Sequence, residues 1–175
     1  FETQAGPRSA RNNLRAWAGL AAAAAGRATE TPALLERASQ AFRVVACAAD
    51  ADGALPREME RGPRALQYQL HAVAPLVTIA AILEPAGYDL FGACGGAIHR
   101  AVDFTARSLV APGVVAGKAG AEQSLLNGED AIEAHDLAWV DTYVARFPSP
   151  ELDRLTRPFD TLAHSKLGGT QRGLW

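Results

Sequence analysis

Alanine and leucine supply most of the apolar residues of this chain, and β-branched residues are sparse. Small and straight-chain side chains lose little rotamer freedom in a helix, whereas β-branched ones lose more. With 175 residues and 49% hydrophobic content, the chain is long enough to form one domain with a core. We therefore expect a single domain with an almost all-α fold.

Start and stop signals place the first helices. Ser9 is expected to cap a helix that runs through the alanine-rich stretch to about Gly26, where glycine is a stop signal. Thr31 followed by Pro32 indicates a cap and a first helical position, and this second helix should extend to about Cys47.

Proline and glycine divide the rest of the chain. A third helix should begin at Pro63, and Pro75 should start or kink another one. The remaining expectations are helices over residues 96–110 and 128–146, a glycine-rich loop over 111–127 and a mostly irregular stretch over 148–175. Helices joined by short turns pack antiparallel, so we expect a layered array of helix pairs.

The charges exclude some classes of protein. A net charge of −2 gives no sign of a nucleic-acid-binding protein or of a basic membrane-surface protein. Fifteen of the 17 cations are arginine, and only Lys118 and Lys166 are lysine. This bias reflects either the composition of the genome or a need for arginine, whose planar fork matches a carboxylate with two parallel hydrogen bonds.

Cys47 and Cys94 indicate either one disulfide or two buried thiols. Without a Cys-x-x-Cys or histidine spacing they do not suggest a metal site, so we expect no metal and no other cofactor. The apolar run 72–83 contains Pro75 and is too short to cross a bilayer, so we expect no membrane span.

A cluster of polar residues follows Pro63. Arg64, Tyr68 and His71 share one face of the expected helix, and Arg61 lies just before it. A guanidinium beside a tyrosine favours the phenolate form, which would suit a general base. The alternative is an amphipathic tyrosine packed on the core, with solvated arginines around it.

A second unusual pattern lies near the start of the chain. Asn12 and Asn13 are poor helix formers, and Trp17 lies one turn beyond Asn13 on the same face. An amide beside a large aromatic ring suits a sugar-binding groove, in which the ring stacks on the sugar. An ordinary helix start with a buried tryptophan is the alternative.

Together these motifs resemble the family 5 polysaccharide lyases, the periplasmic alginate (mannuronate) lyases. The resemblance rests on Asn12-Asn13-x-x-x-Trp17, Asp52-Gly-x-Leu-Pro-x-Glu58-x-x-Arg61, Arg64-Ala-Leu-x-Tyr68 and Ala74-Pro75-Leu76, with weaker echoes in Asp136-Leu-Ala-Trp139, Ala145-Arg146-Phe147 and Lys166-x-Gly168-Gly169. It corresponds to roughly the C-terminal half of a typical member. It implies an incomplete α/α toroid of antiparallel helix pairs around a groove, and we expect the N-terminal half to be missing from this chain.

The resemblance also implies a reaction, the β-elimination of a 4-O-linked uronate polymer: alginate or polymannuronate, or else hyaluronan or polyglucuronate. Residues matching Asn13 and Arg61 neutralise the substrate carboxylate in the family, which stabilises the charge that develops when C5 loses its proton. The tyrosine matching Tyr68 exchanges protons with C5 and with the leaving O4.

Binding roles follow from the same resemblance. Trp17, Arg64 and Lys166 are candidates for substrate binding, with Lys166 where a family arginine is expected. His71 is a further candidate because it lies near Tyr68 and would orient it. The implied partner is an anionic polysaccharide, and the implied location is periplasmic or secreted. No signal peptide is visible in this chain. We expect a monomer.

One position departs from the family pattern Asn-Asn-His, because the catalytic histidine is replaced by Leu14. Leucine neither accepts a proton nor pairs with a carboxylate. Either this is an engineered, inactivated form, or the protein works without that group. In mannuronate and glucuronate the C5 hydrogen and O4 leave from the same side, so Tyr68 alone would suffice, and we expect a preference for such polymers.

Two other functions compete with the lyase. One is a non-catalytic protein that binds acidic polysaccharides, and the other is a helical interaction module. His99, His135 and His164 have no ligand spacing and are expected to be surface residues or satisfied helix residues.

Overall fold

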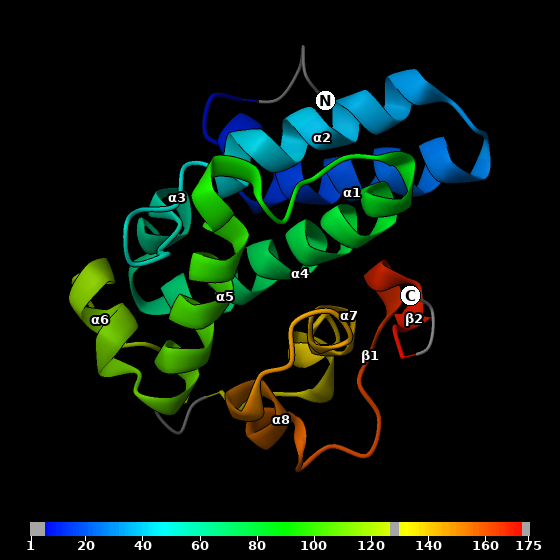
Figure 1. Cartoon of the computed structure of the whole chain (residues 1–175). Helices are drawn as coiled ribbons and strands as arrows, with labels where there is room; N and C mark the ends of the chain where they lie inside the picture. Colours follow the sequence, from blue (N-terminus) through cyan, green and yellow to red (C-terminus); the bar gives the residue numbers. More distant parts are fainter. Residues whose placement is uncertain (1–5, 127–129, 173–175) are drawn as a thin grey trace.

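The computed structural model describes residues 6–126 and 130–172 and shows a helical protein (Figure 1). The long helices are α1 (Asn13–Ala28), α2 (Pro32–Ala46), α4 (Ala65–Leu83) and α5 (Ala93–Val110). The short helices are α3 (Pro56–Met59), α6 (Gly113–Ala119), α7 (Val140–Val144) and α8 (Pro150–Thr156). Strands β1 (Ala163–His164) and β2 (Gly169–Thr170) pair antiparallel near the C-terminus. The 3-10 turns are η1 (Ser9–Arg11), η2 (Gly62–Arg64), η3 (Glu84–Ala86), η4 (Ala134–Leu137) and η5 (Ser165–Leu167).

Helix α4 is the centre of the core. Sixteen of its 19 residues are buried, and it packs against α1, α2 and α5. By length and composition alone, the helical segment Gly62–Ala86 is long and apolar enough to cross a membrane. It is longer than the apolar run 72–83, which was expected to be too short. However, 78% of its most apolar window is buried inside the protein, as in the core helix of a globular domain.

Helices α1 and α2 form a closely packed antiparallel pair, which lies side by side at the top of Figure 1. A Cβ at Gly19 would lie 2.6 Å from the Cβ of Ala41, so the glycine allows the two backbones to approach. Thr31 is the N-cap residue of α2 and Pro32 its first residue, as predicted, although the Thr31 side chain makes no capping hydrogen bond.

The predicted start of α1 was wrong by one turn. Ser9 begins the 3-10 turn η1, and the cap of α1 is Asn12, whose side chain accepts a hydrogen bond from the backbone N–H of Leu14. Asn12 has the extended backbone that an N-cap residue adopts, whereas Ser9 lies inside the 3-10 turn. The helix passes Gly26 and ends at Ala28.

Other boundaries also differ. Pro75 does not start a new helix, because α4 continues through it. The expected loop 111–127 contains α6, and the expected helix 128–146 is replaced by the short elements η4 and α7, with residues 127–129 outside the described part. The stretch 148–172 contains α8 and the strand pair, so it is less irregular than expected.

Two buried glutamines fix the segment between α2 and α4. The Gln69 side chain accepts a hydrogen bond from the backbone N–H of Leu55 and donates one to the carbonyl of Gly53, at 3.0 and 3.2 Å. The Gln123 side chain accepts from the backbone N–H of Leu66 at 2.8 Å. Gly53 itself has a φ of 98°, which favours glycine. These bonds hold α3 and its flanking turns against the start of α4.

The two cysteines are joined. Cys47 and Cys94 form a disulfide that links the C-terminal end of α2 to the first turn of α5, with Cα atoms 5.5 Å apart. Of the two possibilities left open by the sequence, the structure shows the disulfide.

Candidate active site

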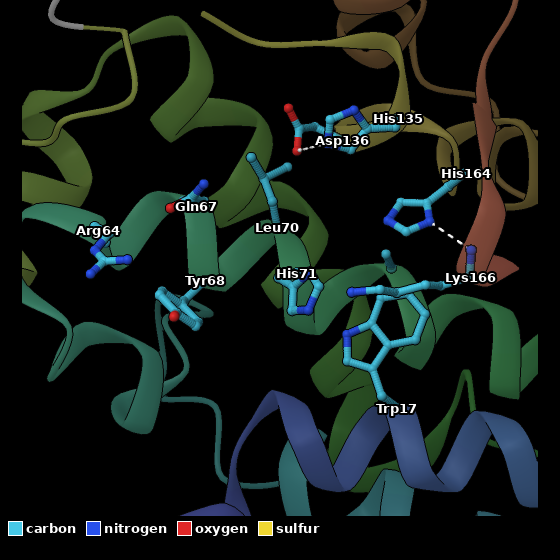
Figure 2. Close-up of a pocket in the computed structure, with 11 residues that line it drawn as sticks. Trp17, Arg64, Gln67, Tyr68, Leu70, His71, His135, Asp136, His164 and Lys166 are labelled. Atoms are coloured by element: carbon cyan, nitrogen blue, oxygen red, sulfur yellow. Dashed lines mark hydrogen bonds and ion pairs between the residues drawn. The ribbon is translucent and has the colours of Figure 1, made fainter. Parts of the chain in front are cut away.

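The first turns of α4 form one wall of a cavity of about 340 Å³ (Figure 2). Helix α1 contributes Trp17, turn η4 contributes His135 and Asp136, and the C-terminal strand pair with η5 contributes His164 and Lys166. The remaining lining residues are Arg64, Gln67, Tyr68, Leu70, His71 and Ala74. Segments that are far apart in the sequence therefore meet at one hollow.

A chain of contacts beside this cavity joins three of the residues singled out from the sequence. The backbone N–H and the side-chain Nδ2 of Asn13 donate to the two oxygens of Glu58, at 2.7 and 3.1 Å. The same carboxylate lies 4.0 Å from Nε of Arg61. The guanidinium carbon of Arg61 lies 4.5 Å from the ring centroid of Tyr68. Asn13, Arg61 and Tyr68 thus share one region between α1, α3 and α4.

Arg61 lies over the face of the Tyr68 ring. In this position it attracts the negative face of the ring and holds the ring in place, an interaction of about 0.5–1 kcal/mol at an exposed site. The Arg61 side chain is 38% exposed, so solvent and a ligand both have access to it.

Glu58 is an unusual residue because its side chain is fully buried. Burial raises the pKa of the Glu58 carboxyl above its ordinary value, while the two hydrogen bonds from Asn13 and the charge of Arg61 oppose that shift. Two hydrogen bonds from Asn13 and the nearby guanidinium of Arg61 take the place of water around this carboxyl group.

The Trp17 ring is in contact with charged and aromatic neighbours. Its centroid lies 5.0 Å from that of His71 and 5.6 Å from that of His164, and Nζ of Lys166 lies 5.6 Å from the same ring. The tryptophan lines the cavity, as a sugar platform would, but it also supports a histidine and a lysine from the C-terminal strand pair.

Two of the three imidazoles that line this cavity, those of His71 and His164, have a lowered pKa. Burial, followed by the charges of Lys166 and two neighbouring histidines, lowers the pKa of His71 to about 4. Burial and the same neighbours also lower the pKa of His164. The lowered pKa values disfavour the charged forms of these two rings, and the other charged residues that line the cavity are Lys166, Arg64 and Asp136.

The residues named from the sequence fall into two groups. Trp17, Arg64, Tyr68, His71 and Lys166 line the cavity. Asn13, Leu14 and Arg61 are not among its lining residues. Asn13 is 1% exposed and meets the others through Glu58, whereas Leu14 directs an apolar side chain outward and is 46% exposed.

Sequence reasoning missed part of the cavity. His135 and His164 were expected at the surface or as satisfied helix residues; His135 is exposed, and both residues also line the cavity beside Trp17. Gln67 and Asp136 also line it; Gln67 could have been found from its helical spacing to Arg64 and His71, whereas no spacing pattern connects Asp136 with Tyr68. His99 is a satisfied residue as expected, since its Nδ1 lies 2.7 Å from the hydroxyl of Tyr143. Among residues 6–126 and 130–172, no three metal-ligating side chains gather as a metal site.

Comparison with known proteins identifies the family of this chain. The family model described as alginate lyase matches residues 2–114. This chain belongs to the alginate lyase family. Relatives include an alginate lyase of Azotobacter vinelandii, 32% identical over 159 residues, which covers 90% of this chain and 42% of the relative. A polysaccharide lyase of Stenotrophomonas maltophilia is 40% identical over 94 residues, 54% of this chain and 28% of the relative.

Solved structures of family members share the fold. Alginate lyase A1-III complexed with a tetrasaccharide superposes with a TM-score of 0.82 at 26% identity, over 97% of this chain and 48% of that one. Alginate lyase A1-III from Sphingomonas species A1 gives a TM-score of 0.79, also at 26% identity, over 97% of this chain and 47% of that one. The prediction of an all-α toroid of antiparallel helix pairs is confirmed. The chain spans about two fifths of the length of the curated relatives and about half that of the solved ones.

Proposed function

We propose that this chain carries the reaction centre of a polysaccharide lyase that cleaves 4-O-linked uronate polymers by β-elimination. The observation that carries the proposal is the connected set Asn13, Glu58, Arg61 and Tyr68 at the edge of a cavity lined by Trp17. An amide and a guanidinium suit a carboxylate, and a phenol suits proton transfer. Membership of the alginate lyase family supports the same reaction.

The proposed reaction needs few groups. Asn13 and Arg61 neutralise the carboxylate of the uronate, so that the electrons released at C5 spread onto an oxygen pair already in contact with donors. The phenolate of Tyr68 removes the C5 proton, a C4–C5 double bond forms, and the C4–O4 bond breaks. The same phenol then gives its proton to O4, which leaves with the other sugar chain.

Leu14 defines the proposed specificity. With no proton-accepting group at this position, a single phenol must serve both C5 and O4, which requires both to lie on one side of the sugar. Mannuronate and glucuronate meet this condition, and guluronate does not. We therefore assign the preferred substrate to the mannuronate or glucuronate type, with an acidic polysaccharide as the partner.

The test compares the protein with its Leu14→His variant on polymannuronate and polyguluronate, followed by the ultraviolet absorbance of the unsaturated product. Leu14 is 46% exposed, so a histidine fits there without repacking the core. We expect the Leu14 protein to act on polymannuronate alone, and the histidine variant to be faster by roughly 100-fold. Release of unsaturated product from polyguluronate by the Leu14 protein would contradict the proposal.

The non-catalytic polysaccharide-binding protein remains the second candidate because of Leu14. It predicts binding without turnover, and no gain when histidine is restored. No feature of the cavity favours it over the lyase, since Arg61 still lies over the ring of Tyr68. Equal inactivity of both proteins with retained polymannuronate binding would favour it.

We place the protein in an oxidising compartment, the periplasm or the cell exterior. The Cys47–Cys94 disulfide supports this, because such bonds persist outside the reducing cytosol. Polymeric substrates too large to enter a cell require the same location.

A further inference from the structure

Glu58 accepts hydrogen bonds from two groups of a single residue. Its Oε1 accepts from the backbone N–H of Asn13, and its Oε2 accepts from Nδ2 of the same residue, over a separation of 45 positions in the chain. The carboxylate is 0% exposed and Asn13 is 1% exposed. The two side chains therefore form a buried unit with one defined geometry.

Both oxygens of Glu58 accept hydrogen bonds from Asn13, and this fixes the orientation of the Asn13 amide. One Nδ2 hydrogen must face Glu58, so the second Nδ2 hydrogen and the amide oxygen have set directions. A neutral glutamine at position 58 would remove this constraint, because an amide both donates and accepts. The Asn13 amide could then turn over and exchange its donor for its acceptor.

The same carboxylate also lies close to Arg61. The contact of 4.0 Å runs between Oε2 of Glu58 and Nε of Arg61, so it does not involve the two terminal guanidinium nitrogens. Those nitrogens keep the fork that matches a carboxylate bidentately. Arg61 lies at the same time over the Tyr68 ring.

We propose that Glu58 is a positioning residue that sets the donor face of Asn13 and the direction of Arg61 for one substrate carboxylate. This inference rests on the proposed function. It adds Glu58 to the site as a residue that does not contact the substrate itself. Glu58 acts through Asn13 and Arg61, which would bind the substrate carboxylate.

A purely structural role would be a helix cap. Asn13 is the first residue of α1, and a carboxylate that accepts its backbone N–H stabilises a helix N-terminus. That role uses Oε1 alone, and Asn12 already caps the same helix through the N–H of Leu14. A cap predicts lower stability after substitution, with no change in how a ligand's carboxylate is recognised.

The experiment measures recognition of the carboxylate by itself. Calorimetric titration in a Tyr68→Phe background, which prevents turnover, compares a mannuronate trisaccharide with its carboxyl-reduced counterpart, a mannose trisaccharide. The variants are Glu58→Gln and, as a matched control, Glu60→Gln, because Glu60 pairs with Arg57 at the surface. We expect Glu58→Gln to lower the preference for the uronate roughly tenfold and the control to leave it unchanged.

The outcomes separate the two proposals. If the Tyr68→Phe protein without a further substitution binds the mannuronate trisaccharide no more tightly than the mannose trisaccharide, both the proposed function and this inference are overturned. If the Tyr68→Phe protein prefers the mannuronate trisaccharide and the added Glu58→Gln substitution leaves that preference unchanged, the inference alone is overturned. Thermal unfolding of each variant is recorded alongside, since a cap would lower the midpoint without changing the preference.

A second measurement leaves Glu58 unchanged, which covers the case in which Glu58→Gln does not fold. By nuclear magnetic resonance of the Asn13 side chain in the Tyr68→Phe protein, we expect one Nδ2 hydrogen to exchange slowly before any ligand is added. The other hydrogen should shift with the mannuronate trisaccharide and not with the mannose trisaccharide. Unchanged Asn13 signals while other cavity resonances respond to the uronate would overturn the inference.

Discussion

Opening the Cys47–Cys94 disulfide should lower the free energy of unfolding by an amount that follows from its place in the chain. The bond closes a loop with a sequence separation of 47. The chain-entropy relation for a loop of that length gives about 4 kcal/mol at 25 °C. For a chain of this size, 1 kcal/mol corresponds to about 2–4 °C in the midpoint, so we expect a fall of about 8–16 °C.

Thermal unfolding followed by circular dichroism, with and without reductant, measures this effect. The sequence has two cysteines, so reductant acts on this bond alone. The double variant Cys47→Ala and Cys94→Ala is the control: it should unfold at the lowered midpoint and show no response to reductant. A fall of less than about 3 °C on reduction would refute the reasoning, because the loop constraint would then contribute little to the unfolded state.

Three further predictions concern the site and its support. Arg61→Lys should lower kcat/KM on polymannuronate by roughly tenfold or more, because lysine offers a point charge in place of a planar fork over the tyrosine ring; steady-state kinetics check this. The pKa of His71 is about 4 in the folded protein and 6.5 in the unfolded chain, so the unfolded chain binds the proton first as the pH falls. The free energy of unfolding should therefore decrease as the pH falls from 6.5 toward 4. Unfolding midpoints measured over that range should decrease less for His71→Gln than for the unchanged protein. Gln69→Met should lower the free energy of unfolding by about 2–4 kcal/mol, since the backbone N–H of Leu55 and the carbonyl of Gly53 would both lose their buried partner; urea titration measures this change.

The long helices of the fold were predictable from local signals. Pro32 at the first position of α2 marks a helix start, and the apolar composition of α4 marks a buried helix. Pro75 misled the prediction because a tightly packed core maintains a helix through a missing N–H, and packing is not visible in a local pattern. The region 111–146 was predicted poorly, since its helices are short and depend on contacts with the rest of the fold.

The candidate site was likewise predictable from the sequence only in part. Tyr68 and His71 lie on α4 and Arg64 is its N-cap residue, so local spacing alone brings them to one surface. His164 and Lys166 reach the same cavity from a strand pair almost 100 residues later, and no periodicity predicts such a meeting. Glu58 belonged to a recognised motif, but its partner Asn13 lies 45 positions away, so its role needed the folded chain.

Helix α4 is both the most buried element of the molecule and the carrier of the phenol proposed to do the chemistry. The buried middle of such an element opens only at a free energy close to that of unfolding the whole domain, so its amide hydrogens should be the slowest to exchange. The wall of the cavity formed by α4 should therefore keep its shape until the domain unfolds, so any activity lost below the unfolding midpoint would come from the other walls. Flexibility needed to admit a polymer must come from the opposite wall, formed by η4 and the C-terminal strand pair.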